Sequence, residues 1–265
     1  MTNLKLYAFL SLLIAGSSIA QPVLQRNNGN LPANYYNTAE GLSCSALKTA
    51  LSGIISNANT NFQYADVIPA HERTDKRRND NNTADIVWDM YSDNPAGAEP
   101  YTYSFSTSNR CGITVSSSKE GDCYNREHTF PQSWFGSALP MLSDLNHVFP
   151  TDAWVNAKRG DSPYGEVTNA SYTSQNGSKL GTGNNFGYTA TVFEPINEYK
   201  GDISRAILYM VVRYESQLPQ WKNLASADNI LDGTTYPSLD PWHLDRKSTR
   251  LNSSHSSVSR MPSSA

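Results

Sequence analysis

The sequence predicts one loop-rich α+β domain. Aromatic and β-branched residues gather in two short segments, 86–91 and 101–105, a composition typical of strands. Apolar side chains recur at helical spacing in two other segments, 47–55 and 203–214. The 265 residues contain no internal repeat and no low-complexity linker before about residue 245, and the apolar share of 38% suits a folded chain rather than a disordered one.

Residues 1–20 have the pattern of a secretory signal peptide. Lys5 provides a short basic start, an apolar run extends from Leu6 to Ala15, and small residues precede the expected cleavage before Gln21. The apolar run is well short of the roughly 20 residues that a membrane-spanning helix needs, and no other segment could span. We therefore expect a secreted mature protein, extracellular or periplasmic, without a membrane anchor.

The remaining elements follow in order along the chain. Ser43 or Ser45 can cap the first predicted helix, which looks like a packing element. The charged and Asn-rich stretch 71–83 is most simply a solvated loop between that helix and the two predicted strands. The second predicted helix carries a continuous apolar stripe, and Asp202 can cap its start.

The three cysteines suit an oxidising compartment and leave one without a partner. The sequence alone does not choose among the three possible pairings. We favour Cys111 with Cys123, because this loop of about a dozen residues leads directly into the stretch described next. Cys44 would then be a buried small hydrophobic residue. A zinc site would need Cys-x-x-Cys spacing, which the sequence lacks.

The side chains with the clearest chemistry lie in two stretches, Gly121–Trp134 and Ser143–Arg159. Glu127 and His128 are adjacent in the first, and Asn156 and Arg159 are three apart in the second, on one face of any helix there. A carboxylate, an imidazole, a carboxamide and a guanidinium thus lie within about 30 residues. These groups suit hydrolysis of a phosphodiester with one hard metal ion.

Both stretches resemble the endonuclease I family of secreted, non-specific nucleases. The resemblance continues through three further segments, Ser162–Val167, Val192–Ile203 and Leu208–Tyr214, and covers roughly residues 86–244. It implies a ββα-metal (His-metal finger) motif, in which a β-hairpin leads into a helix. That helix would span Thr151 to Lys158, with Thr151 as its cap and Asp152 in its first turn.

The resemblance also implies roles for individual residues. His128 would be the general base, and Glu127 and Asn156 would hold one Mg²⁺-type ion through oxygen atoms. An imidazole with an ordinary pKa, near about 6.5, can take a proton from water at neutral pH. Because neighbours on a strand point to opposite faces, we expect the backbone to leave the regular pleat near Glu127 and His128, and Pro131 favours that break.

Further site candidates are less clearly determined by the motif. Arg159 is the candidate phosphate contact, and Arg126 and Asn125 are secondary candidates. Many relatives carry Asn at or beside the position of His147, and here the order is Asn146 followed by His147. This departure leaves open which of the two orients the site.

The expected partner is nucleic acid, DNA or RNA, held through its backbone by a monomer. Residues 21–245 carry 16 Lys and Arg against 24 Asp and Glu, a net charge of −8, which does not attract nucleic acid over long range. Binding should therefore be local, weak and salt-sensitive. Two alternatives stay open: an inactive relative that serves as a binding module, and a glycosidase that uses carboxylates such as Asp152 and Glu166.

The domain is expected to span residues 21–245 and to lack a C-terminal segment that relatives have. Residues 246–265 are rich in Ser, contain no acidic residue and show no helical or strand period. They look like translated adapter or vector sequence, with a natural disordered tail as the alternative. In both cases we expect an unpacked segment in which His255 has no role.

Overall fold

The computed structural model describes residues 32–56, 62–183, 187–224, 230–233 and 235–243. The predicted signal peptide and the predicted C-terminal tail lie outside these residues. The chain divides into two units, Met1–Tyr35 and Tyr36–Ala265. Of the first unit only a turn is described, in which the amide of Tyr35 donates to the carbonyl of Pro32 at 3.1 Å.

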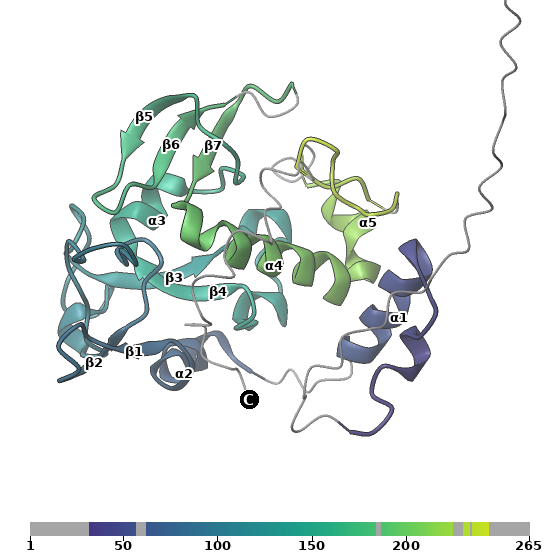
Figure 1. The fold of residues 1–265 in the computed structure, drawn as a ribbon, viewed down its shortest axis with the longest axis horizontal. Coiled ribbons are helices and arrows are strands. Elements are labelled where there is room, and N and C mark those ends of the chain that lie inside the picture. Colours follow the sequence, from purple (N-terminus) through teal and green to yellow (C-terminus); the bar gives the residue numbers. More distant parts are fainter. Residues whose placement is uncertain (1–31, 57–61, 184–186, 225–229, 234, 244–265) are drawn as a thin grey trace, which may run out of the picture. The chain divides into compact units, whose positions relative to one another are not determined.

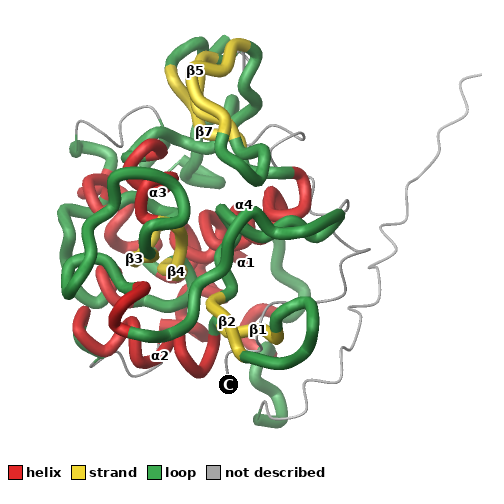
Figure 2. Tube along the Cα trace, turned by 90° about the vertical axis from the view of Figure 1, so that its left-hand side faces the viewer, coloured by secondary structure: helices red, strands yellow, loops and turns green. Residues whose placement is uncertain are grey.

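Small antiparallel sheets and helices make up the second unit (Figure 1). Its described strands are β1 (Lys76–Arg78), β2 (Asp85–Val87), β3 (Tyr124–His128), β4 (Val148–Asp152), β5 (Asn169–Thr173), β6 (Lys179–Thr182) and β7 (Thr191–Glu194). They pair as β1 with β2, β3 with β4, and β5–β6–β7. Long loops connect these elements (Figure 2). The predicted mixed, loop-rich α+β class is therefore confirmed.

The described α-helices are α1 (Cys44–Ser56), α2 (Val67–Thr74), α3 (Ala153–Arg159), α4 (Asn197–Arg213) and α5 (Leu218–Trp221). Single turns of 3₁₀ helix lie at Asn37–Ala39, Tyr64–Asp66, Thr107–Asn109, Gln132–Trp134, Met141–Ser143 and Glu215–Gln217. No described helix is long and apolar enough to cross a membrane.

The main core forms where α4 packs against the β3–β4 pair and the aromatic residues around it. Ile203, Ile207 and Met210 of α4 share this cluster with Phe149 of β4 and Trp88. Burying a side chain of this size stabilises the folded state by about 2 kcal/mol, so the apolar stripe of α4 contributes strongly to stability. The apolar stripe predicted for residues 203–214 is confirmed, and it shares its cluster with β4 through Phe149.

The predicted strand at residues 86–91 is wrong beyond Val87, where β2 ends. The side chain of Asp89 turns the chain, because its Oδ1 accepts from the amide of Tyr91 at 2.9 Å. The segment 101–105 is not a strand either. It is irregular, although the carbonyl of Tyr103 accepts from the amide of Val87 at 2.8 Å. Side-chain hydrogen bonds here outweigh the β propensity of the aromatic residues.

Three expectations about helices and loops also need correction. Asp152, not Thr151, is the residue before α3, and its Oδ1 accepts from the amide of Val155 at 2.8 Å. Asp202 lies inside α4, which begins five residues earlier, at Asn197. The stretch 71–83 is not simply a solvated loop, because it includes the end of α2 and all of β1.

The expected disulfide between Cys111 and Cys123 is confirmed, with the two Cα atoms 5.3 Å apart. Cys44 is free as expected, but it is exposed and not buried. It is the first residue of α1 and has a φ of 51°, in the left-handed region. The sequence pattern identified the helix without identifying the side on which its first residue lies.

Candidate active site

The β3–β4 pair leads directly into α3, and this order places the predicted site residues side by side. Strand β4 ends at Asp152, whose carboxylate caps the helix through Oδ1. Its Oδ2 accepts from the Tyr103 hydroxyl at 2.6 Å and the Gly121 amide at 2.8 Å. The start of α3 is thus tied to the loop that the disulfide closes. A helix end held in this way gives a rigid support for side chains on its first turns.

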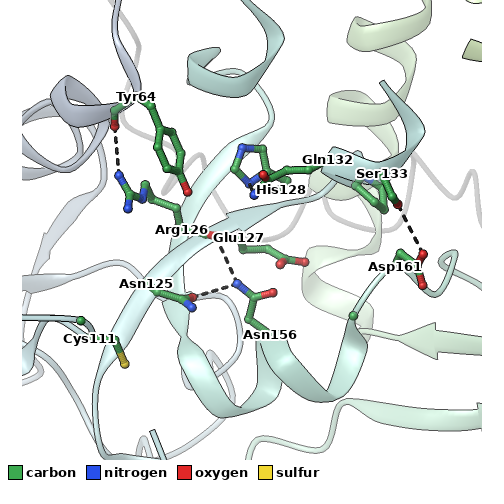
Figure 3. Close-up of a pocket in the computed structure, with 13 residues that line it drawn as sticks. Tyr64, Cys111, Asn125, Arg126, Glu127, His128, Gln132, Ser133, Asn156 and Asp161 are labelled. Atoms are coloured by element: carbon green, nitrogen blue, oxygen red, sulfur yellow. Dashed lines mark hydrogen bonds between the residues drawn. The ribbon is translucent and has the colours of Figure 1, made fainter. Parts of the chain in front are cut away.

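A pocket of about 560 Å³ opens where β3, α3 and two loops meet (Figure 3). It is lined by Tyr64, Cys111, Gly112, Asn125, Arg126, Glu127, His128, Pro131, Gln132, Ser133, Asn156, Gly160 and Asp161. The structure therefore brings Glu127, His128 and Asn156 to one cavity, together with the secondary candidates Asn125 and Arg126. Arg159, Asn146 and His147 are not among the lining residues.

The expected break in the pleat near Glu127 and His128 is wrong. Strand β3 stays paired through both residues, Glu127 opposite Phe149 and His128 opposite Val148. The chain leaves the sheet only after this pair, and Pro131 precedes a turn of 3₁₀ helix. Both residues nevertheless line the pocket, together with Asn125 and Arg126 of the same strand.

Glu127 is held by three donors that all contact the same oxygen. Its Oε1 accepts from Tyr91 Oη at 2.7 Å, from Tyr164 Oη at 3.1 Å and from Arg159 Nη1 at 3.1 Å. Burial, and after it the charge of Glu127, raises the pKa of Tyr91 well above its usual value, so this hydroxyl remains a donor. No hydrogen bond to Oε2 is found among the described residues, which leaves that oxygen available to the pocket.

Asn156 presents its amide in the corresponding way from the middle of α3. Its Nδ2 donates to Asn125 Oδ1 at 2.8 Å and to the carbonyl of Arg126 at 3.2 Å. Both bonds use the nitrogen and fix the amide plane, so the oxygen Oδ1 is left for the pocket (Figure 3). Asn125 therefore acts on the pocket through Asn156, by orienting its amide.

His128 is bound through both ring nitrogens. Nε2 lies 3.0 Å from the carbonyl of Leu142, and Nδ1 lies 3.1 Å from Nε2 of Gln132. A carbonyl oxygen only accepts, so the proton is on Nε2 and the lone pair on Nδ1. Burial, the nearby His147 and the neighbouring arginines lower the pKa of His128 to about 3. The ring is therefore neutral at neutral pH, with Nδ1 as its basic atom. The ordinary pKa near 6.5 expected from the sequence is wrong, because the ring is buried.

Asn146 and His147 have different surroundings in the structure, although they are neighbours in the chain. His147 is fully buried, with its ring 5.5 Å from that of His128 and its Nε2 2.7 Å from the carbonyl of Met141. Asn146 is exposed and donates through its amide nitrogens to Asp144. Of the two, His147 is the one in contact with His128.

Arg159 lies beneath the pocket and not at its surface. Its side chain is 1% exposed, and its guanidinium donates to Glu127 Oε1 and to the carbonyls of His128, Thr129 and Ser162 at 2.8–3.1 Å. A buried group that bridges β3 and the end of α3 does not reach a phosphate in the pocket. Arg126 does line the pocket, and its guanidinium stacks 3.7 Å above the ring of Tyr64.

Three residues that contact the site were not singled out from the sequence. Gln132 lies four residues after His128 and bonds its Nδ1, and both were inside the quoted stretch. Tyr164 lies in the segment 162–167 that carried the resemblance, and Tyr91 lies in a predicted strand. Neither hydroxyl was singled out, because Tyr91 was counted toward the strand and Tyr164 toward the resemblance.

The residues present fit a hard divalent cation. Glu127 Oε2 and Asn156 Oδ1 are one charged and one neutral oxygen donor, the kind of atom that Mg²⁺ prefers, and two protein ligands suit an ion that keeps several waters. No group of three or more His, Cys, Asp or Glu that could hold a metal occurs in the described part of the chain. A softer metal, such as zinc, therefore has no matching set of ligands there.

Comparison with known proteins assigns the family. The model of the Endonuclease I family matches residues 43–246, so the chain belongs to this family. Among individual relatives, it is 32% identical over 183 residues to "Extracellular ribonuclease" of Bacillus amyloliquefaciens, which covers 68% of this chain and 53% of that protein. It is also 32% identical over 184 residues to "Extracellular ribonuclease" of Bacillus subtilis (strain 168), covering 68% and 54%. The chain thus spans about half the length of both. No solved structure matches it significantly.

Proposed function

We propose that this protein is a metal-dependent nuclease that hydrolyses phosphodiester bonds in the pocket around His128. One observation carries the proposal. In a chain of the Endonuclease I family, a neutral imidazole with its lone pair on Nδ1 shares a pocket with two oxygen donors, Glu127 and Asn156. Together with α3, the β3–β4 pair then corresponds to the hairpin and helix of a ββα-metal motif.

In this scheme His128 is the general base. Nδ1 takes a proton from the attacking water, while Nε2–H stays bound to the carbonyl of Leu142. Gln132 holds the ring from the pocket side and exchanges its hydrogen bond for that of the water. A bound Mg²⁺ ion would stabilise the charge that grows on the phosphate and on the leaving 3′ oxygen. Glu127 and Asn156 would hold that ion.

The two arginines would have different roles. Arg126 lines the pocket and is our candidate for contact with a phosphate. Arg159 would act as a positioning residue, because it fixes Glu127 Oε1 and the backbone of His128 from below. We therefore replace the phosphate contact expected of Arg159 with one from Arg126.

We also propose RNA, DNA or both as substrates, since contacts to the phosphate backbone do not read bases. The two relatives are named extracellular ribonucleases, which favours RNA and a secreted location for this chain as well. The division into a signal peptide at 1–20, a nuclease domain at 21–245 and an unpacked tail at 246–265 remains part of the proposal.

The alternatives make different predictions. A glycosidase with Asp152 as one of its carboxylates is disfavoured, because Asp152 is fully buried and both its oxygens are bound in holding α3. A binding module would hold nucleic acid without cutting it.

The test is digestion of RNA, single-stranded DNA and plasmid with Mg²⁺, with EDTA, and with the His128→Ala variant. Cleavage that EDTA and the variant both abolish is expected. Intact substrates with Mg²⁺ would refute the proposal, and cleavage that survives in the variant would refute the role of His128.

A further inference from the structure

A single backbone turn sets the orientation of two imidazoles. The turn Met141–Ser143 offers successive carbonyls, and His147 Nε2 donates to Met141 at 2.7 Å while His128 Nε2 donates to Leu142 at 3.0 Å. The two rings meet edge to face with centroids 5.5 Å apart. Because the carbonyl of Leu142 holds the proton on Nε2, the position of this turn decides which nitrogen of His128 is basic.

The side chain of Asp144 ends this turn and fixes it to α4. Its Oδ2 accepts from Tyr209 Oη at 2.8 Å and from Tyr214 Oη at 2.7 Å. Its Oδ1 accepts from the backbone and side-chain amides of Asn146, both at 3.0 Å. Both tyrosines lie more than 60 positions further along the chain, Tyr209 within α4 and Tyr214 directly after it, so these bonds join the turn to a distant part of the sequence. Four donors on one carboxylate leave it a single orientation.

The backbone of Asp144 transmits this orientation to the histidines. Its amide donates to the carbonyl of Met141 at 3.2 Å, and its carbonyl accepts from the amide of His147 at 3.2 Å. Ser143 holds the turn from the other side, since its hydroxyl donates to the carbonyl of Phe62 at 2.6 Å. Between these two anchors, the carbonyl of Leu142 has a defined position relative to His128.

We infer that Asp144, Tyr209 and Tyr214 form a positioning unit that keeps His128 in the tautomer with Nε2 protonated and Nδ1 basic. This inference rests on the proposed role of His128 as the base. None of the three residues lines the pocket, so they act through the turn and not on the substrate. Removing the hydrogen bonds between these three residues keeps the imidazole rings and the helices in place. It loosens only the carbonyl of Leu142, which selects the tautomer of His128.

The test uses the full chain with the double variant Tyr209→Phe/Tyr214→Phe, which keeps both rings and removes both hydroxyls. Asp144→Asn is the second variant, because an amide nitrogen cannot accept from a tyrosine. Tyr172→Phe is the matched control, since it removes another tyrosine-to-carboxylate hydrogen bond, to Glu120, with no link to His128. The readouts are kcat and KM at saturating Mg²⁺, and the tautomer of His128 from long-range ¹⁵N–¹H NMR, assigned with His128→Gln.

The double variant and Asp144→Asn should lower kcat about 10- to 100-fold with KM nearly unchanged, the range found when groups that orient a functional imidazole are lost. The NMR signal of His128 should change from a single Nε2–H form to a mixture, and Tyr172→Phe should alter neither. An unchanged tautomer in the folded double variant, or a rise in KM with kcat retained, would overturn the inference. A mixed tautomer in a protein that cleaves no nucleic acid would support the unit and refute the nuclease instead.

Discussion

Replacing Arg159 by Met tests whether this arginine is a buried structural group or a substrate contact. In the wild type, Arg159 and Glu127 are each 1% exposed and their charged atoms lie 3.1 Å apart. The variant leaves Glu127 as a buried carboxylate without a countercharge, and removes donors from three backbone carbonyls. Breaking one side of a buried pair costs about 3–5 kcal/mol. The orphaned carbonyls add to this, so we expect a loss of at least about 4 kcal/mol.

That loss is a large part of the roughly 5–15 kcal/mol that stabilises a typical domain. Urea denaturation followed by circular dichroism measures it directly. Arg78→Met is the matched control, because Arg78 pairs with Asp85 at the surface, where both side chains are more than 40% exposed. Loss of this surface ion pair should lower the free energy of unfolding by under about 1 kcal/mol. In the double variant Arg159→Met/Glu127→Gln the buried charge is gone, and part of the stability should return.

A substrate contact would behave in the opposite way. If Arg159→Met unfolded at nearly the same urea concentration as the wild type and only raised KM for nucleic acid, our account of Arg159 would be wrong. The same result would restore the phosphate contact that the sequence suggested. A loss of stability that Glu127→Gln does not relieve would show that the carbonyl contacts, and not the ion pair, carry the effect.

Three further predictions follow from the site and the core. By isothermal titration calorimetry, Asn156→Ala should weaken Mg²⁺ binding at least about tenfold, whereas His128→Ala should leave it near the wild-type value; loss of binding in His128→Ala would make the imidazole a ligand. Removing the disulfide with Cys111→Ala/Cys123→Ala should cost about 3 kcal/mol in urea denaturation, and an unchanged midpoint would contradict this. Burial lowers the pKa of His71 from 6.5 to about 4, so its stabilising contribution is complete above pH 6.5 and is lost as the pH falls towards 4. Between pH 7 and pH 5 the wild type should lose about 2 kcal/mol more than His71→Gln, and equal losses would refute the assignment.

The sequence was most informative where a periodic pattern determines a structure. The apolar stripe of α4 places its buried face without ambiguity, since only one side of a helix can carry it. The short loop between Cys111 and Cys123 likewise favoured the disulfide that is observed. The strand expected at 86–91 failed because Asp89 bonds the backbone two residues later, and composition does not reveal such a bond.

The same contrast holds at the site. Glu127, His128 and Asn156, which the resemblance grouped from two separate stretches, do line one pocket. The sequence could not show that Arg159, the last residue of α3, extends back beneath β3 instead of outward, because residues three apart on a helix share a face whether that face is buried or exposed. Hydrogen bonds between residues far apart in the chain, such as Tyr91 to Glu127, leave no periodic signal at all.

The negative charge of residues 21–245 limits how the pocket can attract a phosphate. A net charge of −8 repels a polyanion at long range, so capture must depend on a few groups at short range. Among the described residues that line the pocket, Arg126 is the one Lys or Arg, and the carboxylates of Glu127 and Asp161 lie in the same lining. Such a pocket is close to neutral or negative by itself. The Mg²⁺ ion proposed for Glu127 and Asn156 would supply the missing positive charge, so we expect removal of the metal to lower substrate binding and catalysis together.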